Sequence, residues 1–292
     1  MNNLVRAEWR KATGNTVLVG CTIWLYPLMG VALLILFAFL LVADPNFAEL
    51  YRENVPNWTE YALFGWNAVF EELGVFRLPL LGFIAYVFAN EYQLNTWKSV
   101  LPGNRRVQVL GAKFLAVALF VVLALSVQSL VVTIGVGILN LVMGLPYPPA
   151  LTPSNIGEFL VEFILIGMLS FVTMIMLAGL AAFLAVSTRS VAFSVAGTLI
   201  ASLLETVAVR IPVGLLVNQF DFENVIYLYL VLPTYNISNI RSFIDTGKPY
   251  EYLLTPDGPQ FPLWLSIAIL TGWTVLLTVS SMRIFSRQDF GE

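Results

Sequence analysis

The longest apolar run in the sequence is VLGAKFLAVALFVVLALSVQSLVVTIGVGILNLVM, residues 109–143, and its only charged residue is Lys113. A helix rises about 1.5 Å per residue, so about 20 apolar residues cross the hydrocarbon core of a bilayer, which is about 30 Å thick. Backbone N–H and C=O groups in lipid have to bond within their own segment, which favours a helix. The run therefore predicts a membrane-spanning helix.

Other stretches share this character, and together they predict six spans, at about 17–43, 73–90, 109–143, 156–186, 191–209 and 261–284. The composition agrees, because 58% of the residues are hydrophobic and only 11% are charged, whereas soluble domains carry about 25% charged residues. No separate soluble domain and no internal repeat is visible. The expected fold is therefore all-α, a polytopic membrane protein with a single transmembrane domain over residues 1–292.

Lysine and arginine are unevenly divided between the two sides of these spans. Ten fall on the side that holds both termini, and five fall in the longer segments on the other side. Because cation-rich loops stay inside, we expect both termini in the cytoplasm and the protein in a bacterial plasma membrane. The apolar stretch 224–233 would belong to a seventh span only if Asp221 and Glu223 entered the membrane, which is costly. We expect instead an outer-side helical hairpin between the fifth and sixth spans.

Several kinds of chemistry are disfavoured by what the sequence lacks. There is no histidine, which removes the commonest general base and the commonest metal ligand. The single cysteine, Cys21, cannot form a disulfide or a cysteine zinc site within one chain. There is also no phosphate-binding loop and no catalytic serine elbow. We therefore expect no enzyme active site, metal or cofactor in this chain, and no nucleic acid as a partner.

Residues 1–15 have a helical pattern of their own. Leu4, Val5 and Trp9 fall near one helical face, and cations lie beside them. We expect an amphipathic interface helix on the inner leaflet, in which Trp9, Arg10 and Lys11 contact the membrane surface. The alternative is a basic flank that only orients the first span.

Three polar residues in or near the spans are candidates for a transport pathway or for structural ionisable groups. Gln128 lies in the third span, Glu162 near the outer end of the fourth, and Glu205 late in the fifth. Ionisable groups at membrane depth are costly and often functional. The alternatives are that the acids reach outward to water or that Glu205 pairs with Arg210.

Segment 89–113, ANEYQLNTWKSVLPGNRRVQVLGAK, is a polar interruption between the second and third spans. Its order of an acid, a threonine, a leucine–proline pair, an arginine and an alanine–lysine pair resembles the membrane subunits of type-2 ATP-binding-cassette exporters. The positions that carry the resemblance are Glu91, Thr96, Leu101, Pro102, Arg105 and Lys113. RAEWRK at 6–11 resembles the N-terminal segment of that family's bacitracin-resistance and lantibiotic-immunity-like permeases.

The resemblance implies a dimer of permease chains, identical or different, and separate cytoplasmic ATPase subunits that bind ATP and magnesium. It also implies that segment 91–108 forms a short coupling helix in a groove of the ATPase. An apolar anchor with a charged rim suits such a contact, and the expected docking residues are Glu91, Thr96, Trp97, Lys98, Val100, Leu101, Arg105 and Arg106. The alternative is an ordinary basic loop that faces lipid phosphate.

The expected function is that of a permease subunit of an ATP-binding-cassette exporter. The few polar positions at membrane depth favour an amphipathic or hydrophobic cargo, such as a peptide antibiotic, a lipid or a lipid-linked compound. A membrane scaffold or signalling protein that recruits a cytoplasmic partner without transport is the alternative. A membrane enzyme is disfavoured because no cluster of catalytic groups is present.

Overall fold

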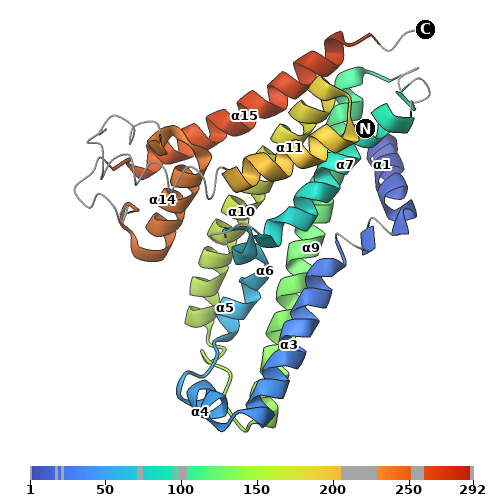
Figure 1. Ribbon diagram of the computed structural model, residues 1–292. Helices are drawn as coiled ribbons and strands as arrows, with labels where there is room; N and C mark the ends of the chain where they lie inside the picture. Colours follow the sequence, from blue (N-terminus) through green and yellow to red (C-terminus); the bar gives the residue numbers. More distant parts are fainter. Residues whose placement is uncertain are drawn as a thin grey trace, which may run out of the picture.

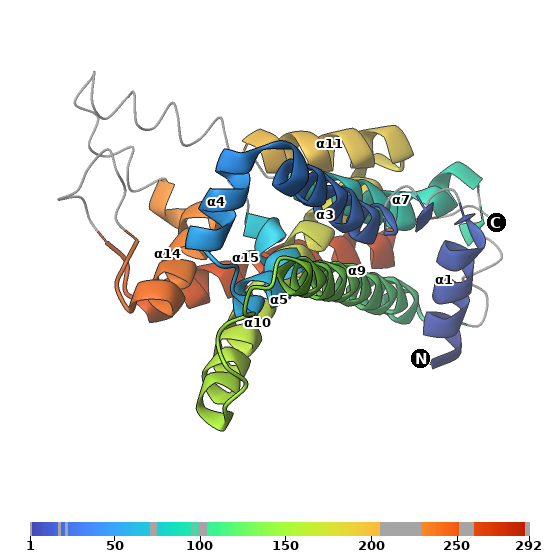
Figure 2. The same cartoon turned by 90° about the horizontal axis from the view of Figure 1, so that it is seen from below.

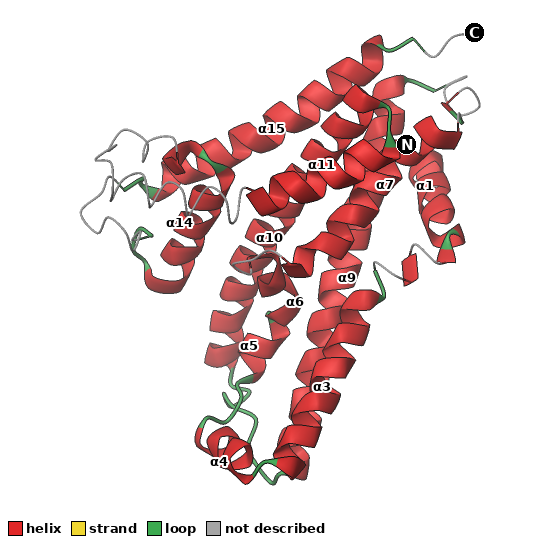
Figure 3. Cartoon of the chain, viewed as in Figure 1, coloured by secondary structure: helices red, strands yellow, loops and turns green. Residues whose placement is uncertain are grey.

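The computed structural model describes residues 2–16, 19–20, 23–70, 75–94, 96–97, 104–204, 229–250 and 260–289. This described part is helical and contains no strand (Figure 3), which confirms the all-α prediction. Within it, four helices are long and apolar enough to cross a membrane: α3 (Leu25–Ala43), α9 (Arg106–Val142), α10 (Pro153–Thr188) and α15 (Leu263–Arg287).

Shorter helices precede, connect and extend these four. The elements are α1 (Asn2–Gly14), α4 (Pro45–Glu53), α5 (Trp58–Ala62), α6 (Phe64–Asn67), the 3₁₀ turns η1 (Ala68–Phe70) and η2 (Val75–Arg77), α7 (Leu78–Leu94), α11 (Val191–Leu203) and α14 (Pro233–Thr246). With 17 and 13 residues, α7 and α11 are shorter than the predicted second and fifth spans require. Most of the predicted outer hairpin, 205–228 and 251–259, lies outside the described residues.

Short polar side chains fix where several helices begin. Asp44 and Thr152 cap α4 and α10 by accepting hydrogen bonds from backbone N–H groups of the first turn, and a proline follows each of them. At the junction of α10 and α11, Arg189 adopts a left-handed conformation with φ of 53°. Ser190 then caps α11 by accepting from the Phe193 N–H at 3.4 Å. This tight turn makes α10 and α11 adjacent helices.

Residues 51–70 and 75–91 run antiparallel along α9 (Figure 1). Contacts at successive levels mark this course: Tyr51 with Asn140, Gly65 with Ser129, Phe83 with Phe120, and Glu91 with Lys113. Helices α5 and α6 therefore reach the middle of α9. Residues 44–70, which lie between the first and second predicted spans, bury Tyr51 and Trp66 within the protein.

The interrupted course of α5 and α6 is possible because α9 and α10 satisfy its backbone. Ser129 Oγ accepts from the Gly65 N–H at 2.9 Å, and Ser170 Oγ donates to the Trp66 carbonyl oxygen at 2.9 Å. A Cβ on Gly65 would lie 2.2 Å from the carbonyl oxygen of Leu125, so only glycine allows this approach. Irregular backbone beside transmembrane helices is tolerated where protein groups replace the missing bonds.

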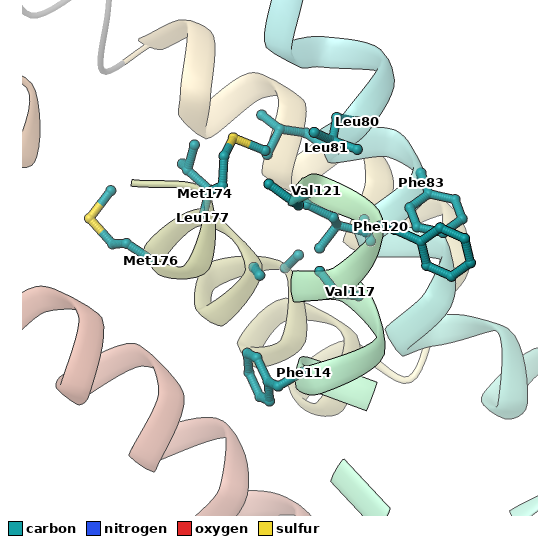
Figure 4. Close-up of a cluster of buried hydrophobic side chains, with 14 of the residues drawn as sticks. Leu80, Leu81, Phe83, Phe114, Val117, Phe120, Val121, Met174, Met176 and Leu177 are labelled. Atoms are coloured by element: carbon teal, nitrogen blue, oxygen red, sulfur yellow. The ribbon is translucent and has the colours of Figure 1, made fainter. Parts of the chain in front are cut away.

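The core lies where α7, α9 and α10 meet, around Leu81, Phe120 and Leu177 (Figure 4). Helix α10 also packs against α11 and α15. Its first half diverges from the other helices (Figure 2) and exposes Val161 and Ile164, as expected for a surface that faces lipid.

Both described ends of the chain lie at one end of the bundle. Helix α1, the last turn of α7, the start of α9 and the last turn of α15 gather at the top of Figure 1, and α4 lies at the opposite end. The predicted coupling segment, 91–108, connects α7 and α9 at this top end.

Candidate functional site

Four charged side chains from three helices form one network at this end of the bundle. Lys113 of α9 donates to Glu8 Oε2 of α1 at 2.8 Å and to Glu91 Oε1 of α7 at 2.7 Å. It also donates to the Val87 carbonyl oxygen at 3.0 Å. Lys11 completes the network at 3.0 Å from Glu8 and 3.2 Å from Glu91. The network ties α1 to the two helix ends that flank the predicted coupling segment.

The network is buried. The side chain of Lys113 is 1% exposed and those of Glu8 and Glu91 are 5% exposed. Burial alone would raise the pKa of Glu8, but Lys113 and Lys11 outweigh it and hold the pKa below its ordinary value of 4.5. Burial alone would lower the pKa of Lys11, but Glu8 and Glu91 raise it above 10.5. Glu8 and Lys11 are therefore charged at neutral pH.

Glu91, which the sequence assigns to ATPase docking, lies inside the protein. Its Oε1 atom takes both ion pairs, and its Oε2 atom has no hydrogen-bond partner among the described residues. A polar cavity of about 50 Å³ adjoins it and is lined also by Asn15, Tyr86 and Asn90. This volume accommodates at least one water molecule, which the free carboxylate oxygen favours.

Trp97, which the sequence predicts to be one of the ATPase-docking residues, is also buried in this chain. Its side chain is 3% exposed and packs on the Phe285 ring of α15, with ring centroids 4.7 Å apart. Tyr92 meets it edge to face at 5.4 Å, and Lys113 Nζ lies 5.7 Å from its ring centroid. Trp97 therefore joins the coupling segment to α15 and to the charged network.

Gln288, just after α15, links three other parts of this site. Its Oε1 accepts from the Tyr92 hydroxyl at 2.7 Å, and its Nε2 donates to the carbonyl oxygen of Val186 at 2.5 Å. Arg106 donates to the carbonyl oxygens of Ser286, at 2.9 Å, and of Gln288. Gln288 was not predicted as part of this site, because a polar residue just after a span is usually exposed to water.

The remaining residues of the predicted docking set are less buried or lie outside the described part. Thr96 donates its N–H to the Glu91 carbonyl oxygen at 3.2 Å. Arg105 is exposed just before α9, and Arg106 is half-buried through its contacts with the end of α15. Lys98, Val100 and Leu101 lie outside the described residues, as does Glu205 of the fifth span.

Helix α1 packs on α9 with one face and carries cations on its exposed face. Trp9 stacks on the Phe120 ring, with centroids 4.1 Å apart and planes 5° apart. Arg6 and Arg10 are exposed, and Lys11 is 46% exposed while bound in the network. The predicted interface helix is thus held by α9 on its buried face.

A family model described as ABC-2 family transporter protein matches residues 8–205. This chain belongs to the ABC-2 family. It is therefore a membrane permease component of an ATP-binding-cassette transporter, and this family generally lacks an ATPase site of its own. The family in general implies an ATP-binding-cassette partner and a dimeric arrangement. No curated protein matches the sequence.

The ABC-2 match begins within α1 at Glu8 and ends just after α11. It therefore contains all four members of the charged network. Helices α14 and α15 lie beyond it, so the contacts that Phe285 and Gln288 make with the coupling segment join the matched region to the rest of this ABC-2 protein.

Two further predicted positions of this ABC-2 permease are placed by the structure. Gln128 is fully buried in α9, and neither side-chain polar atom has a hydrogen-bond partner among the described residues. Glu162 is exposed on α10, close enough to Asp245 and Glu60 to interact with their charges. The structure does not bring these two residues into the charged network.

Proposed function

We propose that this protein is the permease subunit of an ATP-binding-cassette exporter that moves an amphipathic or hydrophobic compound outward. ATP and magnesium would be bound by a separate cytoplasmic ATPase, which docks on segment 91–108. The observation that carries this proposal is the convergence of α1, α7, α9 and α15 on that segment through Glu91, Trp97 and Arg106.

These contacts give the segment a means of moving the spans. A displacement imposed on it by a partner would act on α9 through Lys113, on α1 through Glu8 and on α15 through Phe285. In this proposal Trp97 holds the segment to the bundle, whereas exposed Arg105 belongs to the docking rim with Lys98, Val100 and Leu101. Buried charge pairs suit such a role because they fix one arrangement of the helices.

We further propose six spans, with both termini in the cytoplasm of a bacterium. Helices α3, α9, α10 and α15 supply four, and α7 and α11 supply the cores of the second and fifth. The charged network then lies near the cytoplasmic surface, where Lys and Arg are favoured. The permease would work as a dimer of identical or different chains.

A hydrophobic or amphipathic cargo is favoured by the composition of the long helices. The polar groups of Ser129, Ser170 and Thr173 are occupied by backbone contacts of the protein itself. Charged groups that could bind an ion at depth are scarce in the described spans. A peptide antibiotic, a lipid or a lipid-linked compound fits these helices.

The test is co-purification of an ATPase with the tagged chain from its native membrane in mild detergent. We expect a P-loop ATPase subunit and ATP hydrolysis to accompany the chain. The variant Leu101→Ala with Arg105→Glu should abolish both while membrane insertion and thermal stability stay normal. Arg287→Glu, an exposed cation change on α15, is the control and should retain both.

Two results would contradict the proposal in different ways. If no ATPase accompanies the wild-type chain, the scaffold or signalling function is favoured over transport. If the ATPase is present but the Leu101 and Arg105 variant retains it, docking takes place elsewhere on the permease.

A further inference from the structure

An open apolar groove of about 480 Å³ runs between α1 and the exposed face of α9. Trp9 forms one side, and Leu119, Val122, Leu123 and Ser126 form the other. The three aliphatic side chains are between 39% and 46% exposed, so their apolar surface is open to a ligand. The volume lies in the range of small-molecule sites, about 300–1,000 Å³.

The groove is held open by fixed side chains. Trp9 cannot turn into it without losing its stacking on Phe120, at a centroid separation of 4.1 Å. The preceding residue, Glu8, is bound to the buried Lys113 at 2.8 Å. The ring of Trp9 therefore forms a rigid wall, and the site exists before any ligand binds.

Two cations of α1 lie close to Trp9 in the sequence, three residues before it and one residue after it. Arg6 and Arg10 are exposed, and their side chains form no ion pair with the residues that the structure describes. Each residue advances about 100° around a helix, so both arginines lie on the flank of Trp9 that is opposite the charged network. Lys11, by contrast, lies on the network side and is bound there.

We propose that this groove is a binding site for one phospholipid with an anionic headgroup. One acyl chain lies along Leu119, Val122 and Leu123 beneath Trp9, and the phosphate contacts the Arg6 and Arg10 guanidinium groups. An apolar groove below a paired cationic rim is complementary to such a lipid. A partner helix is about 10 Å wide with its side chains and would need a broader surface.

The site holds a resident lipid of α1 and α9 and does not depend on the transported compound. None of the residues that line it belongs to the coupling segment or to the charged network. Because lipid binding to the purified chain needs no ATPase, its outcome is separate from that of the proposed export function.

The experiment measures the dissociation constant of the first bound lipid by native mass spectrometry of the full-length chain in detergent. The probes are dioleoyl phosphatidylglycerol and dioleoyl phosphatidylcholine. Two arginines near a phosphate, at about fivefold each, predict that phosphatidylglycerol binds about 25-fold more tightly. Added salt should reduce this preference, because exposed charges are screened.

Paired variants locate the two halves of the site. Arg6→Gln with Arg10→Gln should abolish the preference for phosphatidylglycerol, whereas Arg283→Gln with Arg287→Gln, equally spaced and exposed on α15, should preserve it. Leu123→Trp fills the groove and should weaken both lipids at least tenfold. Leu130→Trp, an exposed leucine of α9 outside the groove, is its control.

The proposal is overturned if the two lipids bind equally to the wild-type chain, or if the Arg6 and Arg10 variant keeps the preference. It is also overturned if Leu123→Trp binds as the Leu130→Trp control does. Should the glutamine variant be poorly folded, Arg6→Lys with Arg10→Lys replaces it. That variant keeps the charge and should keep the preference, and its loss would count against an electrostatic rim.

Discussion

Lys113→Met tests the physical account of the charged network most directly. The substitution keeps an apolar stem of similar length and removes the ammonium group that bonds Glu8, Glu91 and the Val87 carbonyl. Two carboxylates then remain buried with only Lys11 between them. Removing one partner of a buried ion pair is more costly than replacing both, because a charge is left uncompensated.

The expected loss follows from what the carboxylates can do instead. Lys11 is 46% exposed, so water screens its attraction. A buried carboxylate can take up a proton, which at pH 7 costs about 3.7 kcal/mol from an ordinary pKa near 4.3 at about 1.4 kcal/mol per unit. This limits the destabilisation to about 3–4 kcal/mol, within the range for broken buried pairs. At pH 5 the same uptake costs about 1 kcal/mol.

Unfolding in mixed micelles with increasing dodecyl sulfate, followed by tryptophan fluorescence, provides the assay. Lys113→Met should lose about 3–4 kcal/mol at pH 7 and about 1 kcal/mol at pH 5. Glu91→Gln in the same chain should restore part of the loss, and Lys248→Met at an exposed site should change stability by less than about 0.5 kcal/mol. An equal loss at both pH values would refute the reasoning.

The other predictions concern single contacts, measured by the same unfolding assay. Burial raises the pKa of Glu8, but Lys113 and Lys11 outweigh it and lower the pKa, so its share of stability should be present above pH 4.5 and be lost as the pH falls through the lower folded-state pKa; a wild-type stability unchanged down to pH 2 would contradict this. Gly65→Ala should cost about 1–3 kcal/mol, since its Cβ would meet backbone. The control Gly82→Ala, with nothing within 4 Å, should be neutral or up to about 1 kcal/mol more stable. Gln128→Leu should raise stability by about 1–3 kcal/mol by removing a buried unpaired amide, and a loss would mean that the amide has a partner in the working transporter. Gln288→Ala should cost about 1–3 kcal/mol through its two side-chain hydrogen bonds, and no loss would mean that they are exchanged for water.

The long helices could be predicted because their signal is local. Residues 109–143 and 156–186 are mostly apolar, and the structure places α9 and α10 over them with ends shifted by only a few residues. A run of apolar residues longer than the bilayer needs has few alternatives to a helix. The α1 helix was predicted from its periodicity, and the family was suggested by the resemblance of segment 89–113 and is confirmed by the family match.

The interrupted segment beside α9 could not be predicted in this way. Its aromatic residues are as compatible with a lipid interface as with burial against protein, and hydropathy does not separate the two. What decides the outcome is that Ser129 and Ser170, distant in sequence, supply the missing backbone partners of Gly65 and Trp66. Such pairings depend on how helices meet, which a single sequence does not contain.

The buried ion pairs of Glu91 could not be predicted for a related reason. An acidic residue at the end of a span is usually exposed to water. Glu91 also occupies a position that carries the family resemblance, which suggested contact with the ATPase. Its partner Lys113 lies 22 residues later and Glu8 lies 83 residues earlier, so no local pattern joins them. Burial of the three together was visible only in the folded chain.

Polar contacts set the register of this bundle. Apolar side chains pack against lipid about as well as against each other, so they do little to fix one helix relative to another. The antiparallel course of residues 51–70 and 75–91 along α9 is instead fixed at three levels, by Tyr51 with Asn140, Gly65 with Ser129 and Glu91 with Lys113. Sliding α7 by one turn would break the pair of Glu91 with Lys113, and sliding α9 by one turn would break all three contacts. A displacement of the coupling segment therefore has to carry α9 with it as a unit, and the network of Glu8 adds α1 to the moving body.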